Sequence, residues 1–336
     1  MKNKNKIIMG VLIVIVIASI LFFSYSKNLP TGAVVSEKEK ITIAQSITPK
    51  AALLIIAEKK GYFAEEGLDA DIKPFSSGRL ALDALLSKDV DFANVADVPI
   101  MSAGFNKQKI LVIATIVKTN NEVKVVARKD HGISKPTDLK GKKVAVFTGT
   151  SSEIFAYYFL KANGLTVKEV SFVNLRPEEM PIALARWDID AYVVWEPFAY
   201  NGAKLLGNKS LIFTNSKIYP NTFNIVVNGD FALKNQETLK KFLKALIKAE
   251  YFIKNNRDES VKIVAGSLGM DYHTLGSIWN DYNFEVSLDK SLVGYLEKDA
   301  DWALVTGVFE NTKIPDYRSM IYEKPLKEIE PQAVTI

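Results

Sequence analysis

Small polar residues recur at points where a predicted strand ends and a predicted helix begins. Serine and threonine add hydroxyl groups at little steric cost, and the free N–H groups at a helix N-terminus attract anions. In open α/β sheets, ligands bind beyond the carboxyl ends of the strands. These turns are therefore candidates for binding a small polar or anionic molecule, with plain helix capping as the alternative. The residues concerned are Ser46, Thr48, Ser76, Ser77, Gly78, Thr148, Gly149, Thr150, Ser151 and Ser152.

One string places an indole, a carboxylate and a proline directly after a predicted buried strand, Trp195-Glu196-Pro197. Trp195 could form an apolar wall of a binding site, and Glu196 could accept a hydrogen bond from a ligand amine. The alternative is that the tryptophan lies in the core and the glutamate caps a helix. Asp97, two residues before Pro99, could bind a ligand or cap a helix. Arg176 lies just after a predicted strand and could pair with an anion or simply face solvent.

Several classes of site are excluded by composition. The chain has no cysteine and two histidines, His131 and His273, so disulfides, thiolate chemistry and multi-histidine metal sites are impossible. The turn at Thr148–Ser152 lacks the Gly-Lys-Ser/Thr ending of a phosphate-binding loop. We therefore expect no metal, no cofactor and no nucleotide. The tryptophans outside the string are expected in the core; they are Trp187, Trp279 and Trp302.

The formal charge of +5 is concentrated near the N-terminus. Six lysines and two glutamates lie in residues 1–40, which leaves 37 basic and 36 acidic residues in the rest. A nucleic-acid-binding protein usually carries a basic patch or stripe. No Lys/Arg run after residue 40 suggests one, so nucleic acid is not an expected partner.

An uncharged apolar run, Ile7 to Phe23, follows three lysines at the N-terminus. Seventeen residues of helix span about 25 Å, near the lower limit for crossing a hydrocarbon core. The positive-inside rule places the N-terminus in the cytoplasm and the rest of the chain outside. We expect an uncleaved membrane anchor in residues 1–26, with a cleaved signal peptide as the alternative. Residues 27–40 are expected to form a tether.

Beyond residue 40, β-rich runs alternate with helical stretches, a pattern typical of parallel sheets covered by helices. The series restarts near residue 143 and becomes mostly helical after residue 228. We expect an α/β fold with two lobes, one from residues 41–127 and 222–336 and the other from residues 128–221. The strands predicted at Val123–Arg128 and Thr222–Val227 would carry the chain between the lobes. A crevice between two such lobes is a favoured ligand site.

Four sequence blocks in order resemble the substrate-binding proteins of the nitrate/sulfonate/taurine importer family, which also includes binders of a thiamine pyrimidine precursor. The resemblance covers about residues 40–324. The blocks are Gly61-Tyr62-Phe63 with Glu66-Gly67-Leu68-Asp69; Gly78, Ala84-Leu85 and Asp89-Val90-Asp91-Phe92-Ala93; Lys135-Pro136 with Asp138-Leu139-Lys140-Gly141-Lys142-Lys143-Val144; and Asp190-Ala191 with Trp195-Glu196-Pro197. The lipoprotein cysteine usual in the family is missing, and the apolar N-terminal run stands in its place.

This resemblance implies a type II periplasmic-binding-protein fold, two lobes joined by a two-strand hinge with the ligand between them. It implies an extracytoplasmic protein of an ABC importer that delivers a sulfonate, taurine-like, nitrate-like or pyrimidine solute to permease subunits. The alternative is an enzyme on the same fold acting on a small aromatic or pyrimidine-type substrate. That enzyme would need a base, for which Glu196, Asp97 and His131 are the candidates. The related pyrimidine synthases use His and Cys residues, so we expect binding without catalysis.

Overall fold

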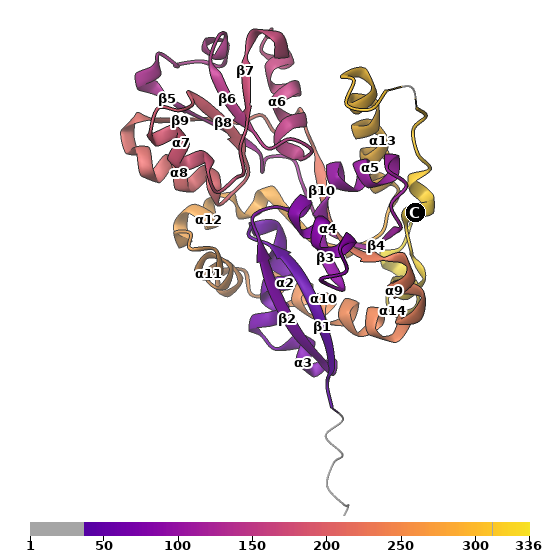
Figure 1. Cartoon of the computed structure of the whole chain (residues 1–336). Coiled ribbons are helices and arrows are strands. Elements are labelled where there is room, and N and C mark those ends of the chain that lie inside the picture. The colour runs from indigo at the N-terminus through magenta and orange to yellow at the C-terminus, as the bar shows by residue number, and fades with distance from the viewer. Residues whose placement is uncertain (1–36, 311) are drawn as a thin grey trace, which may run out of the picture. The chain divides into compact units, whose positions relative to one another are not determined.

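The computed structural model describes residues 37–310 and 312–336, and strands and helices alternate along much of this part of the chain (Figure 1). Residues 38–336 form one compact unit. The predicted membrane anchor, residues 1–26, lies outside the described residues, as does most of the predicted tether. Among the residues described, no helix has the length and apolarity needed to cross a membrane.

The first sheet has six strands within the described residues, in the order β11-β4-β10-β3-β1-β2. Strand β1 pairs in parallel with β2 and β3, whereas β10 and β11 run antiparallel to their neighbours. Strand β10 is buried almost end to end, as expected for a central strand that is covered on both faces. The strands are β1 (Glu39–Ser46), β2 (Leu68–Phe75), β3 (Phe92–Ala96), β4 (Ile110–Thr119), β10 (Asn221–Asn228) and β11 (Tyr282–Ser287).

The second sheet has five strands in the same described ranges, in the order β7-β6-β8-β5-β9. Its central strand β8 pairs in parallel with β6 and antiparallel with β5. The strands are β5 (Lys124–Arg128), β6 (Lys143–Val146), β7 (Ser171–Asn174), β8 (Ala191–Val194) and β9 (Ser210–Phe213). The chain passes from the first sheet to the second through residues 120–123 and returns through residues 214–220.

The helices follow the strands closely, and several begin at a side-chain cap. Ser77 accepts a hydrogen bond from the backbone N–H of Leu80, and Thr150 accepts one from that of Ser152. The helices are α2 (Ala52–Lys59), α3 (Tyr62–Glu65), α4 (Gly78–Leu86), α5 (Asp97–Phe105), α6 (Ser151–Ala162), α7 (Met180–Ala185), α8 (Phe198–Leu206), α9 (Gly229–Lys234), α10 (Gln236–Asn255), α11 (Arg257–Leu268), α12 (Tyr272–Ile278), α13 (Lys290–Val305) and α14 (Lys324–Ile329).

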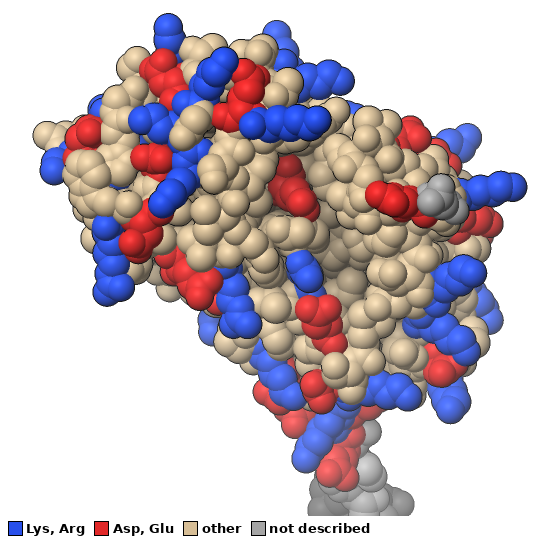
Figure 2. Space-filling model, turned by 45° about the horizontal axis from the view of Figure 1, so that its top comes forward, with Lys and Arg blue, Asp and Glu red and all other residues tan. Residues whose placement is uncertain are grey.

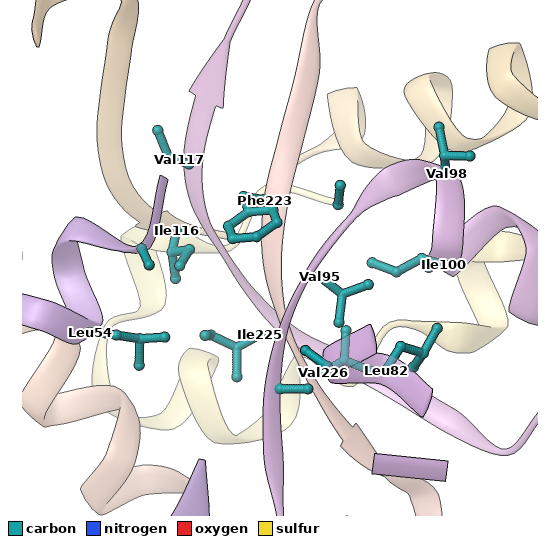
Figure 3. Close-up of a cluster of buried hydrophobic side chains, with 14 of the residues drawn as sticks. Leu54, Leu82, Val95, Val98, Ile100, Ile116, Val117, Phe223, Ile225 and Val226 are labelled. Carbon is teal, nitrogen blue, oxygen red and sulfur yellow. The ribbon is translucent and has the colours of Figure 1, made fainter. Parts of the chain in front are cut away.

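The larger hydrophobic core lies around strands β3 and β10 and the helices packed on them. Val95 of β3 and Ile225 of β10 are fully buried, and Leu54 of α2 and Leu82 of α4 belong to the same cluster (Figure 3). Phe223 of the same cluster pairs with Ala96, the last residue of β3 before α5 begins. The core therefore holds rigidly the strand ends from which the polar turns of this half emerge.

Trp187 corrects one prediction from the sequence. Trp279 and Trp302 are buried as expected, but Trp187 is 57% exposed, in a left-handed backbone conformation with φ of 70°. The guanidinium carbon of Arg128 lies 4.2 Å from the centroid of the Trp187 ring. The centroids of the Trp187 and His131 rings are 4.0 Å apart. A cation–π contact with the buried Arg128 holds this exposed indole in place, whereas the sequence predicted a core position.

Helix α8 packs against Tyr192 so closely that it requires glycine at position 202. A Cβ atom at Gly202 would overlap the Tyr192 hydroxyl, which donates to the Phe198 carbonyl at 2.9 Å. We expect Gly202→Ala to lower the free energy of unfolding by roughly 1–3 kcal/mol, as overpacking does, despite the better helix propensity of alanine.

Urea unfolding measures this change, and Gly266→Ala in α11 is the matched control. A Cβ atom at Gly266 meets no atom within 4 Å. The control should therefore leave stability unchanged or raise it by up to about 1 kcal/mol. Equal stability of the two variants would contradict the tight packing of Tyr192 on α8.

Candidate functional site

A small cavity lies where strand ends and helix starts of the two sheets meet. Its volume is about 10 Å³, roughly the space that one water molecule needs. Residues that follow β1, β2, β3, β6 and β8 all contribute to its wall, as the rule for open α/β sheets predicts. The lining residues are Ser46, Thr48, Lys50, Gly78, Arg79, Ala96, Pro99, Thr150, Ser151, Trp195 and Phe223.

Lys50 is the central cation of this cavity and is only 2% exposed. Its ammonium lies 2.7 Å from Oε1 of Glu122, and that oxygen also accepts from the Asn221 amide at 3.4 Å. The ammonium also lies 4.4 Å from the ring centroid of Phe223 and 5.9 Å from that of Trp195. Two aromatic faces and one carboxylate thus surround a buried positive charge, which each of them stabilises.

A second buried ion pair lies beside Trp195. The ammonium of Lys124 is 3.3 Å from Oε1 of Glu196, and Oε2 of Glu196 accepts from the backbone N–H of Tyr200 at 2.7 Å. Both carboxylate oxygens of Glu196 therefore have partners within the protein. Glu196 does not line the cavity, although its neighbour Trp195 does.

Arg79 connects the two halves of the site. Its Nη1 donates to the carbonyl oxygen of Thr148, and its guanidinium lies 5.4 Å from the ring centroid of Phe147. The close approach suits Gly149, where a Cβ atom would lie 3.0 Å from Nη1 and where φ is +74°. Arg79 belongs to α4 beside the first sheet, and Thr148 follows β6 of the second, so this hydrogen bond joins the two halves at a residue of the cavity lining.

Asp97 is fully buried at the start of α5 and directly follows Ala96 of the lining in the sequence. Its Oδ2 accepts from the backbone N–H of Thr222 at 3.0 Å, and Oδ1 has no hydrogen-bond partner among the described residues. Burial raises the pKa of Asp97 to about 7, against the effect of the nearby Lys50 charge. The carboxyl group of Asp97 therefore favours its protonated, neutral form up to near neutral pH.

The structure brings some of the candidate residues from the sequence to the cavity and leaves others outside it. Six of them line it: Ser46, Thr48, Gly78, Thr150, Ser151 and Trp195. Ser77 caps α4, and Ser152 donates to the Val193 carbonyl at 2.6 Å. Arg176 is exposed and its backbone N–H bonds to Glu179. The candidates that do not line the cavity are Ser76, Ser77, Asp97, Thr148, Gly149, Ser152, Arg176 and Glu196.

Five residues of the lining were not among the candidates from the sequence: Lys50, Arg79, Ala96, Pro99 and Phe223. Lys50 and Arg79 each lie one or two residues beyond a candidate polar turn. That position in the first turn of a helix, next to a candidate turn, is the signal that could have found them. Nothing local to the sequence distinguishes Phe223 from the other buried residues of β10.

Acidic and basic side chains are interspersed on the face of the molecule drawn in Figure 2, without a large area of one sign. That face lacks the basic stripe that binding to nucleic acid requires. Within the described ranges, no three His, Asp or Glu side chains are grouped so that they could hold a metal ion.

The Lys50–Glu122 pair makes a large difference to stability if one partner is lost. We expect Glu122→Gln to lower the free energy of unfolding by about 3–5 kcal/mol, because it leaves the Lys50 ammonium buried without a counter-charge. Denaturant unfolding is the measurement. Glu259→Gln removes the carboxylate of an exposed pair with Lys60 and should cost about 0–1 kcal/mol. Equal losses in the two variants would show that the buried pair has no special role.

Comparison with known proteins identifies relatives that are named as solute-binding proteins. The chain is 32% identical to the taurine-binding periplasmic protein of Escherichia coli, over 62% of this chain and 65% of that one. It is 29% identical to a putative aliphatic sulfonates-binding protein of Bacillus subtilis, over 77% and 79% of the two chains. These relatives are named as binding proteins and not as enzymes.

The fold is shared with a solved structure, the alkanesulfonate-binding protein of Xanthomonas axonopodis pv. citri bound to MOPS. The TM-score is 0.75 at 17% identity, over 86% of this chain and 99% of that one. The predicted periplasmic-binding-protein fold is thereby confirmed. The model of the NMT1/THI5-like family matches residues 48–260, well over half of the chain. The chain belongs to the NMT1/THI5-like family.

Proposed function

We propose that this solute-binding protein of an ABC-type importer recognises a small organic anion of the sulfonate class in the cavity between its sheets. The observation that carries the proposal is that two cations, Lys50 and Arg79, line the same cavity as several hydroxyl groups. A sulfonate presents three oxygens that accept charge-assisted hydrogen bonds, which are stronger than neutral ones. Ser151, the first residue of α6, also lines the cavity, and its backbone N–H at the helix N-terminus is a further candidate donor.

The aromatic side chains of the lining favour an organic solute over a bare inorganic ion. Trp195 and Phe223 line the same cavity as the cations. Aromatic faces contribute to affinity by burying apolar area of the solute. An alkyl or aryl sulfonate has more apolar area to bury than nitrate has. The taurine- and sulfonate-binding relatives are in accord with this class of solute.

The enzyme interpretation finds no support at the three residues that would have to act as its base. His131 lies away from the cavity, with Nδ1 2.5 Å from Oδ1 of Asp190. Glu196 is bonded to Lys124 and Tyr200, and Asp97 is fully buried and does not line the cavity. We therefore propose binding and release without chemical conversion.

Opening of the cavity is part of the proposed function, because a space of about 10 Å³ admits about one water molecule. We propose that the lobes of residues 41–127 with 222–336 and of residues 128–221 move apart about the two crossing segments. Two short connections allow a hinge motion with changes in few backbone angles. The Arg79–Thr148 hydrogen bond breaks when the lobes separate and forms again when they close.

We propose that the protein works outside the cytoplasm and delivers its solute to permease subunits in the cytoplasmic membrane. The apolar run behind three lysines supports a membrane anchor in residues 1–26, with the folded part outside. Fractionation tests the anchor: release of the folded part into the soluble fraction, with its N-terminus removed, would contradict it.

Calorimetric titration tests the class of solute. We expect ethanesulfonate and taurine to bind, and nitrate, bicarbonate and pyrimidines to bind more weakly or not at all. Arg79→Gln should weaken sulfonate binding roughly tenfold to a hundredfold, since a hydrogen bond to a charged group contributes about 1.5–3 kcal/mol. The control Arg257→Gln changes an exposed arginine on α11 and should bind as the wild type does. Tight binding of a pyrimidine with no binding of any sulfonate would contradict the proposal.

Small-angle X-ray scattering tests the motion of the lobes. We expect Arg79→Gln to raise the radius of gyration of the free protein, because it removes the hydrogen bond to Thr148. Saturation with a solute that calorimetry has shown to bind should lower it again. If the wild type and Arg79→Gln have the same radius of gyration, with and without solute, the hinge motion is contradicted.

A further inference from the structure

The buried charges around the cavity cancel before any solute enters. Lys50 is paired with Glu122 and Lys124 with Glu196, and the exposed fraction of these four side chains is 7% or less. Asp97 is an additional carboxyl group in this cluster, fully buried and without a salt-bridge partner among the described residues. Apart from Arg79, which does not belong to this buried set, the cavity therefore has no surplus of positive charge with which to receive an anion.

The groups that face Asp97 come from four other parts of the chain. Lys50 is the nearby cation and Glu122 the nearby anion. Tyr219, before β10, and Asp299 of α13 complete the set, and burial raises the pKa of both well above their ordinary values. Atoms of Asp97, Tyr219 and Asp299 have no hydrogen-bond partner among the described residues. The raised pKa values of these groups favour their neutral, protonated forms, so a further negative charge in the cluster is disfavoured.

An anion in the cavity lies next to this cluster, because Ala96 and Pro99 on either side of Asp97 both line the wall. We propose that Asp97 takes up one proton from solvent when a solute with only a negative charge binds, and so makes the charge of the solute a determinant of specificity. This inference rests on the proposed function. A sulfonate, as the anion of a strong acid, stays ionised, so the proton goes to the protein.

A zwitterionic solute behaves differently at the same site. Its ammonium group brings a positive charge into the cavity, close to the buried carboxyl group of Asp97, whose Oδ1 has no hydrogen-bond partner among the described residues. Ionised Asp97 then has a counter-charge, and no proton is needed. Ethanesulfonate and taurine differ only in that ammonium group, so the pair separates the two cases.

The direction of the pH dependence follows from the free protein. Because the pKa of Asp97 is raised to about 7, the carboxyl group is protonated below that pH in the absence of solute. Ethanesulfonate then binds without taking up a proton, and its affinity is independent of pH below about pH 6. Above pH 7 the proton must be taken from solvent, and the affinity falls by up to tenfold per pH unit.

Calorimetry of the wild type in two buffers of different ionisation enthalpy, from pH 5.5 to pH 8.5, measures the proton directly. We expect uptake of close to one proton per ethanesulfonate at pH 8 and of none per taurine. Binding of both probes with the same pH dependence would overturn the inference and leave the proposed function standing. Absence of binding by either probe at every pH would overturn both.

Variants assign the proton to a residue. Asp97→Asn keeps the acceptor for Thr222 and removes the titration, so ethanesulfonate should bind with little pH dependence and more tightly than the wild type at pH 8. Asp258→Asn, at an exposed carboxylate of α11, should keep the wild-type profile. A wild-type profile in Asp97→Asn would overturn the assignment. If Asp97→Asn does not fold, the buffer comparison on the wild type still decides whether a proton is taken up.

Discussion

Burying an ammonium group costs several kcal/mol unless a partner compensates for the lost water, and Lys50 finds that partner 72 residues further along the chain. Glu122 lies in the segment through which the chain passes from the first sheet to the second. The pair therefore ties the first helical turn after β1 to a crossing segment. It also positions the ammonium between two aromatic rings, so the wall of the cavity and the crossing point are held by one contact.

The alternation of strands and helices could be predicted because each element carries its own period and its own end signals. Serine and threonine caps mark the starts of α4 and α6 within two residues of the prediction. Strand β11 was not predicted, although its residues alternate between buried and less buried. Its existence depends on pairing with β4, where Tyr282 lies opposite Thr119, more than 160 residues earlier in the chain. The local sequence around β11 does not indicate this long-range partner.

The site was predictable to the extent that it is made of turns at strand ends. Ser46, Thr150 and Trp195 reach the cavity for that reason. Lys50 could not be assigned, since a lysine in a helical stretch normally faces solvent and its burial is decided by Glu122. Glu196 shows the opposite case: its carboxylate was singled out for a ligand, and Lys124 and Tyr200 bond to it within the protein.

The Arg79 hydrogen bond to Thr148 has a consequence for the sensitivity of the receptor. The bridged form has room for about one water, so under the proposed hinge motion solute enters only those molecules in which the bridge is broken. The rate of solute capture is then proportional to the fraction of open molecules. A stronger bridge lowers that fraction and slows capture, and it also slows release because the closed, loaded form regains the same contact. Under this proposal, one arginine contact sets how fast the protein exchanges its solute.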